Sequence, residues 1–146
     1  MRLIIQRVSK ASVTVKNNII GQIDQGLLIL LGIHKDDTAA PIPFLTEKCV
    51  NLRIFEDDAG KMNRSILDIG GAILCISQFT LYGDASKGRR PSFIKAARPE
   101  LAEPLYNAFI DALKKYPISI ETGQFGADMA VSLINDGPVT LTLEQT

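Results

Sequence analysis

Short apolar segments bounded by turn residues fill most of this sequence, and they constrain its fold more than any other feature. Residues 3–5, 11–15, 19–23 and 27–31 are such segments, and Val13 and Val15 alternate with polar neighbours as in a half-buried strand. The Asn17-Asn18 pair predicts a turn, because Asn tolerates positive φ. We predict further strands over residues 52–55, 72–76, 118–122, 130–135 and 139–143.

Only two segments have the spacing of amphipathic helices. The first has Thr38 as its predicted N-cap, Pro41 near its start, and apolar residues at 42, 45, 49 and 52. The second spans residues 99–116, with a predicted apolar stripe of Leu101, Leu105, Ala108, Phe109, Ala112 and Leu113. Two helices among many strands predict a single α+β domain over residues 1–146, with mostly antiparallel, barrel-like sheets.

The inventory of reactive side chains excludes several kinds of chemistry. An ordinary zinc site needs three or four Cys and His ligands, and the chain has only three such side chains, one His and two Cys, so we expect no metal and no cofactor. A Ser-His-Asp triad would have to use His34, which lies in a polar turn. Cys49 and Cys75 lie among apolar residues and are expected to be reduced thiols in the core.

The hydrophobic segments also indicate where in the cell the protein is expected. The longest apolar run, residues 27–33, is too short to cross a bilayer, and residues 1–7 do not resemble a signal peptide. We therefore expect a soluble, cytoplasmic protein that does not bind membranes.

A net charge of zero hides an uneven distribution. Residues 84–98 carry five basic side chains and one acidic one, whereas residues 99–146 carry two basic and seven acidic ones. The basic segment is either a solvated loop or a phosphate-binding patch. Arg89 and Arg90 suit the second interpretation, because guanidinium groups bind phosphate oxygens in a bidentate fork.

Two polar segments are candidates for a site. In residues 77–81, SQFTL, a buried strand ends in polar side chains, which indicates either an ordinary strand edge or the rim of an active site. In residues 135–140, NDGPVT, Asp-Gly favours a hairpin turn, but Pro138 removes an N–H where the returning strand would pair. Base rates alone favour a trans Gly137–Pro138 bond.

Several motifs, in order along almost the whole chain, resemble the D-aminoacyl-tRNA deacylase family. They are Arg7-Val8 with residues 11–13, LRIF and DAGKMN at 52–63, SQFTLY at 77–82, KGRRPSF at 87–93, FGADM at 125–129 and NDGPVT at 135–140. The resemblance implies a homodimer that hydrolyses the ester between a D-amino acid and the 3′-terminal adenosine of tRNA. It assigns catalysis to Ser77, Gln78, Phe79 and Thr80, and tRNA binding to Lys87, Arg89 and Arg90.

The resemblance also implies how chirality is read. Gly137 and Pro138 of one subunit, joined by a cis bond, would enter the active site of the other and accept hydrogen bonds from the substrate α-ammonium. An L side chain would then collide with this backbone, a D side chain would point outward, and glycyl-tRNA would also be a substrate.

The catalytic group is open at this stage. Thr80 could act as a nucleophile, but it would need a base, and His34 is the only imidazole. We favour an oxyanion hole built from the Phe79 N–H and nearby groups, with the ribose 2′-OH assisting water. The competing hypotheses are an RNA-binding module without activity and a Thr-nucleophile hydrolase of small esters.

Overall fold

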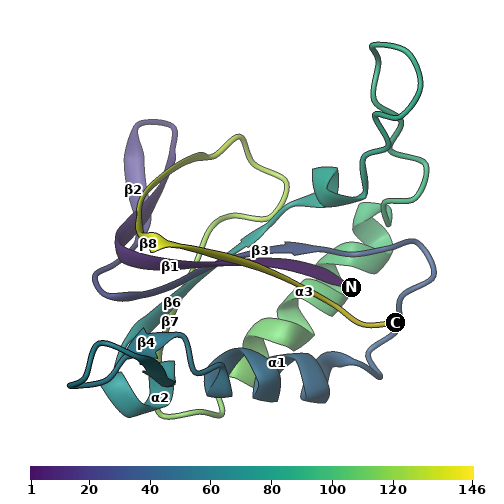
Figure 1. The fold of residues 1–146 in the computed structure, drawn as a ribbon. Helices are drawn as coiled ribbons and strands as arrows, with labels where there is room; N and C mark the ends of the chain where they lie inside the picture. Colours follow the sequence, from purple (N-terminus) through teal and green to yellow (C-terminus); the bar gives the residue numbers. More distant parts are fainter.

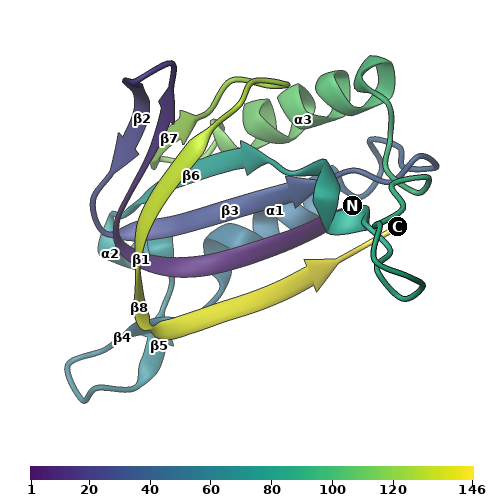
Figure 2. The same cartoon turned by 90° about the horizontal axis from the view of Figure 1, so that it is seen from above.

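A computed structural model describes residues 1–146, and its centre is a six-stranded sheet that curls into a nearly closed barrel (Figures 1 and 2). The strand order is β2-β1-β3-β6-β7, and β8 pairs with the other edge of β1. The strands of this sheet are β1 (Arg2–Val15), β2 (Asn18–Ile23), β3 (Gly26–Gly32), β6 (Ala72–Ser77), β7 (Ser119–Thr122) and β8 (Ala130–Glu144). The predicted α+β class is therefore confirmed.

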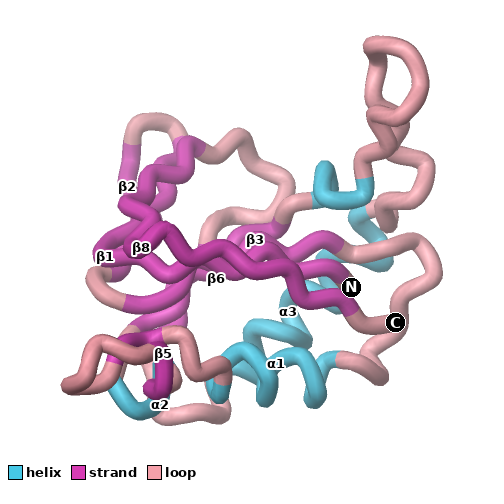
Figure 3. Tube along the Cα trace, viewed as in Figure 1, coloured by secondary structure: helices cyan, strands magenta, loops and turns pink.

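The remaining elements are small or lie against the sheet. Strands β4 (Phe55–Glu56) and β5 (Met62–Arg64) form a separate hairpin, and η1 (Phe79–Tyr82) is a 3₁₀ helix that follows β6. The helices are α1 (Ile42–Asn51), α2 (Ile66–Ile69) and α3 (Pro99–Leu113). Figure 3 shows α1 and α3 side by side below the sheet, and they contact each other.

Strand β1 organises the molecule, because it pairs with three other strands. It is antiparallel to β2, β3 and β8, whereas β3–β6 and β6–β7 are parallel pairs. Leu3 lies opposite Leu31 of β3, and Leu31 lies opposite Ser77 of β6. At the other end, Arg7 lies opposite Leu27, and β8 leaves regular register with β1 between Gln6 and Lys10.

The main core lies between the sheet and the two long helices. Apolar side chains of β1, β3 and β6 pack there against α1 and α3, and Phe109 is the largest fully buried side chain. Cys49 and Cys75 are both unpaired and buried in this core, as predicted. Burial raises the pKa of the Cys49 thiol to about 12. No helix of the structure is both long and apolar enough to span a bilayer.

The structure corrects several local predictions. The predicted strands 3–5 and 11–15 are one continuous strand, and the β1–β2 turn is formed by Lys16 and Asn17, both with positive φ, rather than by Asn17-Asn18. Residues 52–54 are not a strand. Thr38 does not cap α1, because its hydroxyl accepts from the Ala40 N–H and Pro41 is the N-cap.

The buried face of α3 also differs from its prediction. Leu105, Phe109 and Leu113 are buried as predicted, but Leu101 is exposed. Ala102, Tyr106 and Ile110 complete the buried stripe instead. The stripe is therefore rotated by about one residue relative to the predicted one.

Candidate functional site

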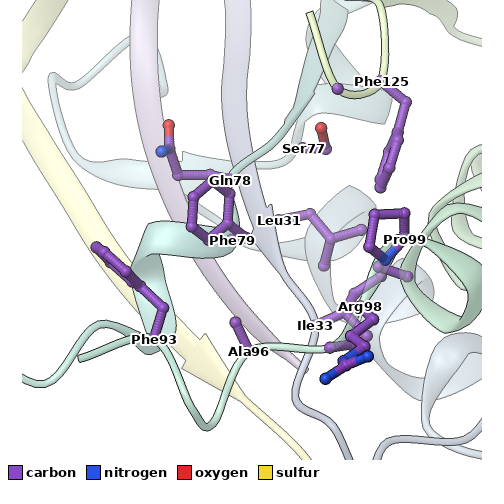
Figure 4. Close-up of a pocket in the computed structure, with 13 residues that line it drawn as sticks. Leu31, Ile33, Ser77, Gln78, Phe79, Phe93, Ala96, Arg98, Pro99 and Phe125 are labelled. Atoms are coloured by element: carbon purple, nitrogen blue, oxygen red, sulfur yellow. The ribbon is translucent and has the colours of Figure 1, made fainter.

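A cavity of about 420 Å³ opens where the parallel strands β3 and β6 end (Figure 4). Its wall is mostly apolar with a few polar groups, an arrangement typical of small-molecule sites; Ser77 and Gln78 lie on one side and Arg98 lies on another (Figure 4). It is lined by Leu31, Ile33, Ser77, Gln78, Phe79, Phe93, Ala96, Ala97, Arg98, Pro99, Ala102, Phe125 and Gly126. Ser77, Gln78 and Phe79, three of the four predicted catalytic residues, are therefore in this wall.

The polar side of the cavity is formed where β6 stops pairing. The Gln78 N–H donates to the Leu31 carbonyl at 2.8 Å, and the chain then turns into η1 instead of continuing as a strand. The N–H groups of Phe79 and Thr80 open this helix, so neither has an acceptor within it. Peptide donors are thus available beside Gln78.

Thr80, the fourth predicted residue, lies next to the cavity but is absent from its wall. Its hydroxyl accepts a hydrogen bond from the Gln78 amide, and no imidazole or carboxylate bonds to it. His34 has other contacts: its Nδ1 accepts from the Asp36 N–H at 3.2 Å, and its ring lies 5.1 Å from that of Tyr82. The structure thus gives Thr80 no base.

A segment ending at α3 closes another side of the cavity. The Ala97 N–H donates to the Ile33 carbonyl and the Lys35 N–H donates to the Lys95 carbonyl, which fixes this segment to the end of β3. Phe93 packs edge to face against Phe79 with ring centres 5.3 Å apart, and both rings remain substantially exposed. Apolar rings therefore stand at the mouth of the cavity.

The opposite wall is supported from the core. Phe125 lies against Tyr106, with ring centres 5.9 Å apart. The Tyr106 hydroxyl is buried and donates to the Cys75 carbonyl at 2.8 Å. Burial raises the pKa of Tyr106, so this donor keeps its proton.

Gly137 and Pro138 are joined by a cis bond, as the resemblance implies and against the base rate. The predicted hairpin at 135–140 is wrong, because β8 continues through these residues as one strand. Gly137 has φ +121° and both residues are exposed. The pair is thus presented on the surface.

Arg7 contacts this segment, and the sequence analysis assigned no role to its side chain. Its side chain is almost fully buried. Its Nε donates to the Asp136 carbonyl at 3.2 Å and lies 3.2 Å from the Asp136 carboxylate, and another nitrogen donates to the Ile54 carbonyl at 2.7 Å. The available signal was an arginine within an apolar strand, a position that requires partners.

The two motifs do not meet within one chain. The cavity lies at the Leu3–Leu31–Ser77 end of the sheet, whereas Gly137 lies beside Arg7 on the far side of β1. Four residues along β1 and three strand spacings separate them, about 20 Å measured along the surface of the curved sheet. Neither Gly137 nor Pro138 is among the residues that line the cavity.

The predicted basic segment is a loop that projects from the body of the molecule between η1 and α3 (Figure 1). Lys87, Arg89 and Arg90 are exposed and form no ion pairs. Backbone hydrogen bonds between Asp84 and Ser92 close the loop at its base. The three cations are therefore free to contact an anionic partner.

Comparisons with known proteins agree along the full length. The sequence model of the family described as D-Tyr-tRNA(Tyr) deacylase matches residues 4–144. Proteins named D-aminoacyl-tRNA deacylase from Thermosipho africanus and Brevibacillus brevis are 56% and 58% identical to the chain. Each alignment covers 99% of this chain, and 97% and 99% of the relative respectively.

Two solved structures have the same fold. One, described as a c-Myc DNA unwinding element binding protein, has a TM-score of 0.93 and 45% identity, covering 100% of this chain and 99% of its own. The other, described as a probable eukaryotic D-amino acid tRNA deacylase, has a TM-score of 0.83 and 16% identity, covering 97% of each chain. The second likeness concerns the fold alone.

Proposed function

The chain belongs to the D-aminoacyl-tRNA deacylase family, and from this premise we propose that it hydrolyses the ester joining a D-amino acid to the 3′-terminal adenosine of tRNA. One observation carries the proposal beyond family membership. The wall of an apolar cavity contains Phe79, the first residue of η1, whose N–H has no acceptor within that helix, and the wall holds no activated nucleophile. Such a site can bind a nucleoside and stabilise a developing oxyanion.

The terminal adenosine is the proposed occupant of the cavity. Phe125, Pro99 and Leu31 offer apolar surface to a purine ring (Figure 4). Ser77 and Gln78 lie on the polar side, where they order the pocket and the ribose. This places the 3′-ester beside Phe79.

Water is the proposed nucleophile. It attacks the ester carbonyl, the Phe79 N–H and nearby groups stabilise the oxyanion, and the ribose 3′-oxygen leaves with a proton. The ribose 2′-OH orients and assists the water. Thr80 serves this site through its bond to Gln78, since it has no base of its own.

Chirality is read, in our proposal, by Gly137 and Pro138 of a second copy of the chain. Their carbonyls accept hydrogen bonds from the substrate α-ammonium, which lies only one carbon from the ester carbonyl. Because the two motifs lie about 20 Å apart along the curved sheet of one chain, we assign this pair to a partner. An L side chain then meets the Gly-Pro backbone, whereas glycine and D residues do not.

The exposed apolar side chains fit such a homodimer. Phe79 and Phe93 stand at the cavity mouth, and Leu133, Ile134 and Leu141 are exposed along β8. Strand β8 is also an edge of the sheet, with unpaired backbone groups along its outer side. A second copy covering these residues removes apolar surface from water while delivering Gly137–Pro138.

The projecting loop is the proposed contact with the tRNA backbone. Lys87, Arg89 and Arg90 give it a positive surface although the whole chain is neutral. A few phosphate contacts imply modest binding that weakens as salt rises.

The direct test is deacylation of D-tyrosyl-tRNA, L-tyrosyl-tRNA and glycyl-tRNA by the purified protein. We expect ester loss from the D and glycyl substrates and none from the L substrate. Loss of the L ester at a comparable rate would refute the chiral mechanism. Binding of tRNA without loss of any ester at micromolar enzyme would instead support an RNA-binding module.

A further inference from the structure

Arg98 is the only charged residue in the wall of the nucleoside cavity, and no part of the proposed mechanism uses it. It lies immediately before α3, and Figure 4 shows its guanidinium on the side of the cavity away from Ser77. The other lining residues are apolar, apart from Ser77 and Gln78. Arg98 is therefore an isolated cation in an apolar wall.

The guanidinium of Arg98 has no partner within the chain. It takes part in none of the ion pairs and donates none of the side-chain hydrogen bonds of the structure, and the residue is exposed. Arg2, Arg7 and Arg64, by contrast, are each paired with a carboxylate. Arg98 therefore keeps its full hydrogen-bonding capacity for a ligand.

The first backbone N–H groups of α3 contribute little to anion binding at this edge of the cavity. The group available to an anion is therefore the Arg98 side chain. Pro99 has no N–H, and the N–H groups of Leu101 and Ala102 both donate to the Arg98 carbonyl. Only the Glu100 N–H remains free at this end of the helix, and the acidic side chain of Glu100 disfavours an anion there. The guanidinium is thus the main group at this edge of the cavity that is available to an anion.

We propose that Arg98 binds the 5′-phosphate of the nucleotide whose adenosine fills the cavity, and so distinguishes a nucleotide ester from a nucleoside ester. This proposal rests on the proposed function. In this proposed pose the 3′-ester lies beside Phe79 and the purine against the apolar wall, and the 5′-phosphate takes the side of the cavity away from Ser77, where the Arg98 guanidinium lies (Figure 4). The one negative charge of the terminal nucleotide then meets the one charged residue of the wall.

The chemistry of the two groups is matched. A guanidinium presents parallel N–H donors that fit two phosphate oxygens, and such charge-assisted bonds are stronger than neutral ones. Because the phosphate is remote from the reacting bond, its binding positions the ester without taking part in bond breaking. Arg98 is accordingly a positioning residue.

The test compares two small substrates, the D-tyrosyl esters of adenosine and of adenosine 5′-monophosphate. For the unaltered protein we expect kcat/KM to be about tenfold higher with the phosphate ester, mainly through KM. Arg98→Gln should bring the ratio of the two values close to one, and Arg98→Lys should restore part of it, since it returns the charge without the fork. Lys114→Gln, which removes a cation from the other end of α3, should leave the ratio unchanged.

Two results would overturn the proposal. The unaltered protein could show no preference for the phosphate ester, or Arg98→Gln could lower kcat/KM equally for both esters, as a purely structural residue would. Failure of the proposed function is distinguishable, because the unaltered protein would then hydrolyse neither ester and no D-aminoacyl-tRNA.

Discussion

Replacing Gly137 by alanine tests the chiral site most informatively, because the structure shows what the added methyl would meet. A Cβ at this position would lie 2.8 Å from an Arg7 guanidinium nitrogen and 2.9 Å from Val139 Cγ2. The backbone φ of +121° is also one that L residues rarely adopt. Strain and crowding together should lower the free energy of unfolding by about 2–4 kcal/mol.

Activity should fall even where the variant is fully folded. In the proposed dimer the methyl also stands beside the substrate Cα, so we expect kcat/KM for D-tyrosyl-tRNA to fall at least about 100-fold, equivalent to about 2.7 kcal/mol. Urea unfolding and the melting temperature measure the first effect, with an expected fall of roughly 5–15 °C. Deacylation at a temperature where the variant is folded measures the second.

Gly60→Ala is the matched control. Gly60 also has a positive φ, +75°, but a Cβ there would meet nothing within 4 Å, and the residue lies in the β4–β5 turn. The control should lose about 1 kcal/mol of stability and retain full activity. Normal turnover by a correctly folded Gly137→Ala protein would refute the reasoning.

Three further predictions concern the catalyst, the loop and the core. Thr80→Val should keep most activity, and a D-aminoacyl-tRNA ending in 2′-deoxyadenosine should react poorly; the opposite pair of results would make Thr80 the nucleophile. Arg89→Gln with Arg90→Gln should weaken tRNA binding and flatten its salt dependence, and a titration with equal salt slopes for variant and parent would exclude this loop as the tRNA contact. Burial raises the pKa of the Cys49 thiol from 9.0 to about 12, so this thiol ionises at lower pH in the unfolded chain than in the folded one. The free energy of unfolding should therefore fall as the pH rises between these two pKa values, by about 1.4 kcal/mol per pH unit. Urea unfolding of Cys49→Ala should show a shallower fall over the same pH range.

The sequence predicted the elements whose patterns are local. The alternating and β-branched residues placed β2, β3, β6 and β7 within one or two residues, and apolar spacing found α1 and α3. It could not show that residues 2–15 form one strand, because Arg7 and Lys10 interrupt the apolar pattern. Arg7 is tolerated there only because Ile54 and Asp136, distant in sequence, satisfy its guanidinium.

In the candidate site, too, only the residues with a local sequence pattern could be predicted. The SQF segment was found because a buried strand ends there in polar side chains, and these three residues do line a cavity. The same cavity is also lined by Phe125, Pro99 and Arg98, which come from loops and a helix terminus. Contacts between such segments cannot be predicted from the periodicity of the sequence. The conformation of residues 135–138 also depends on tertiary context. The Asp-Gly pair there locally favours a hairpin, but β8 extends through it as one strand.

We propose that each active site combines the cavity of one chain with Gly137–Pro138 of its partner. Mixing the Gln78→Ala and Gly137→Ala proteins tests this directly, once each alone has been shown to be inactive and subunit exchange has been verified with labelled chains. In a heterodimer one site would then carry both substitutions and the other neither, so deacylation of D-tyrosyl-tRNA should return to about a quarter of the parental rate at equal mixing. Full exchange without any recovered activity would contradict the claim, because it would mean that both motifs act within the same chain.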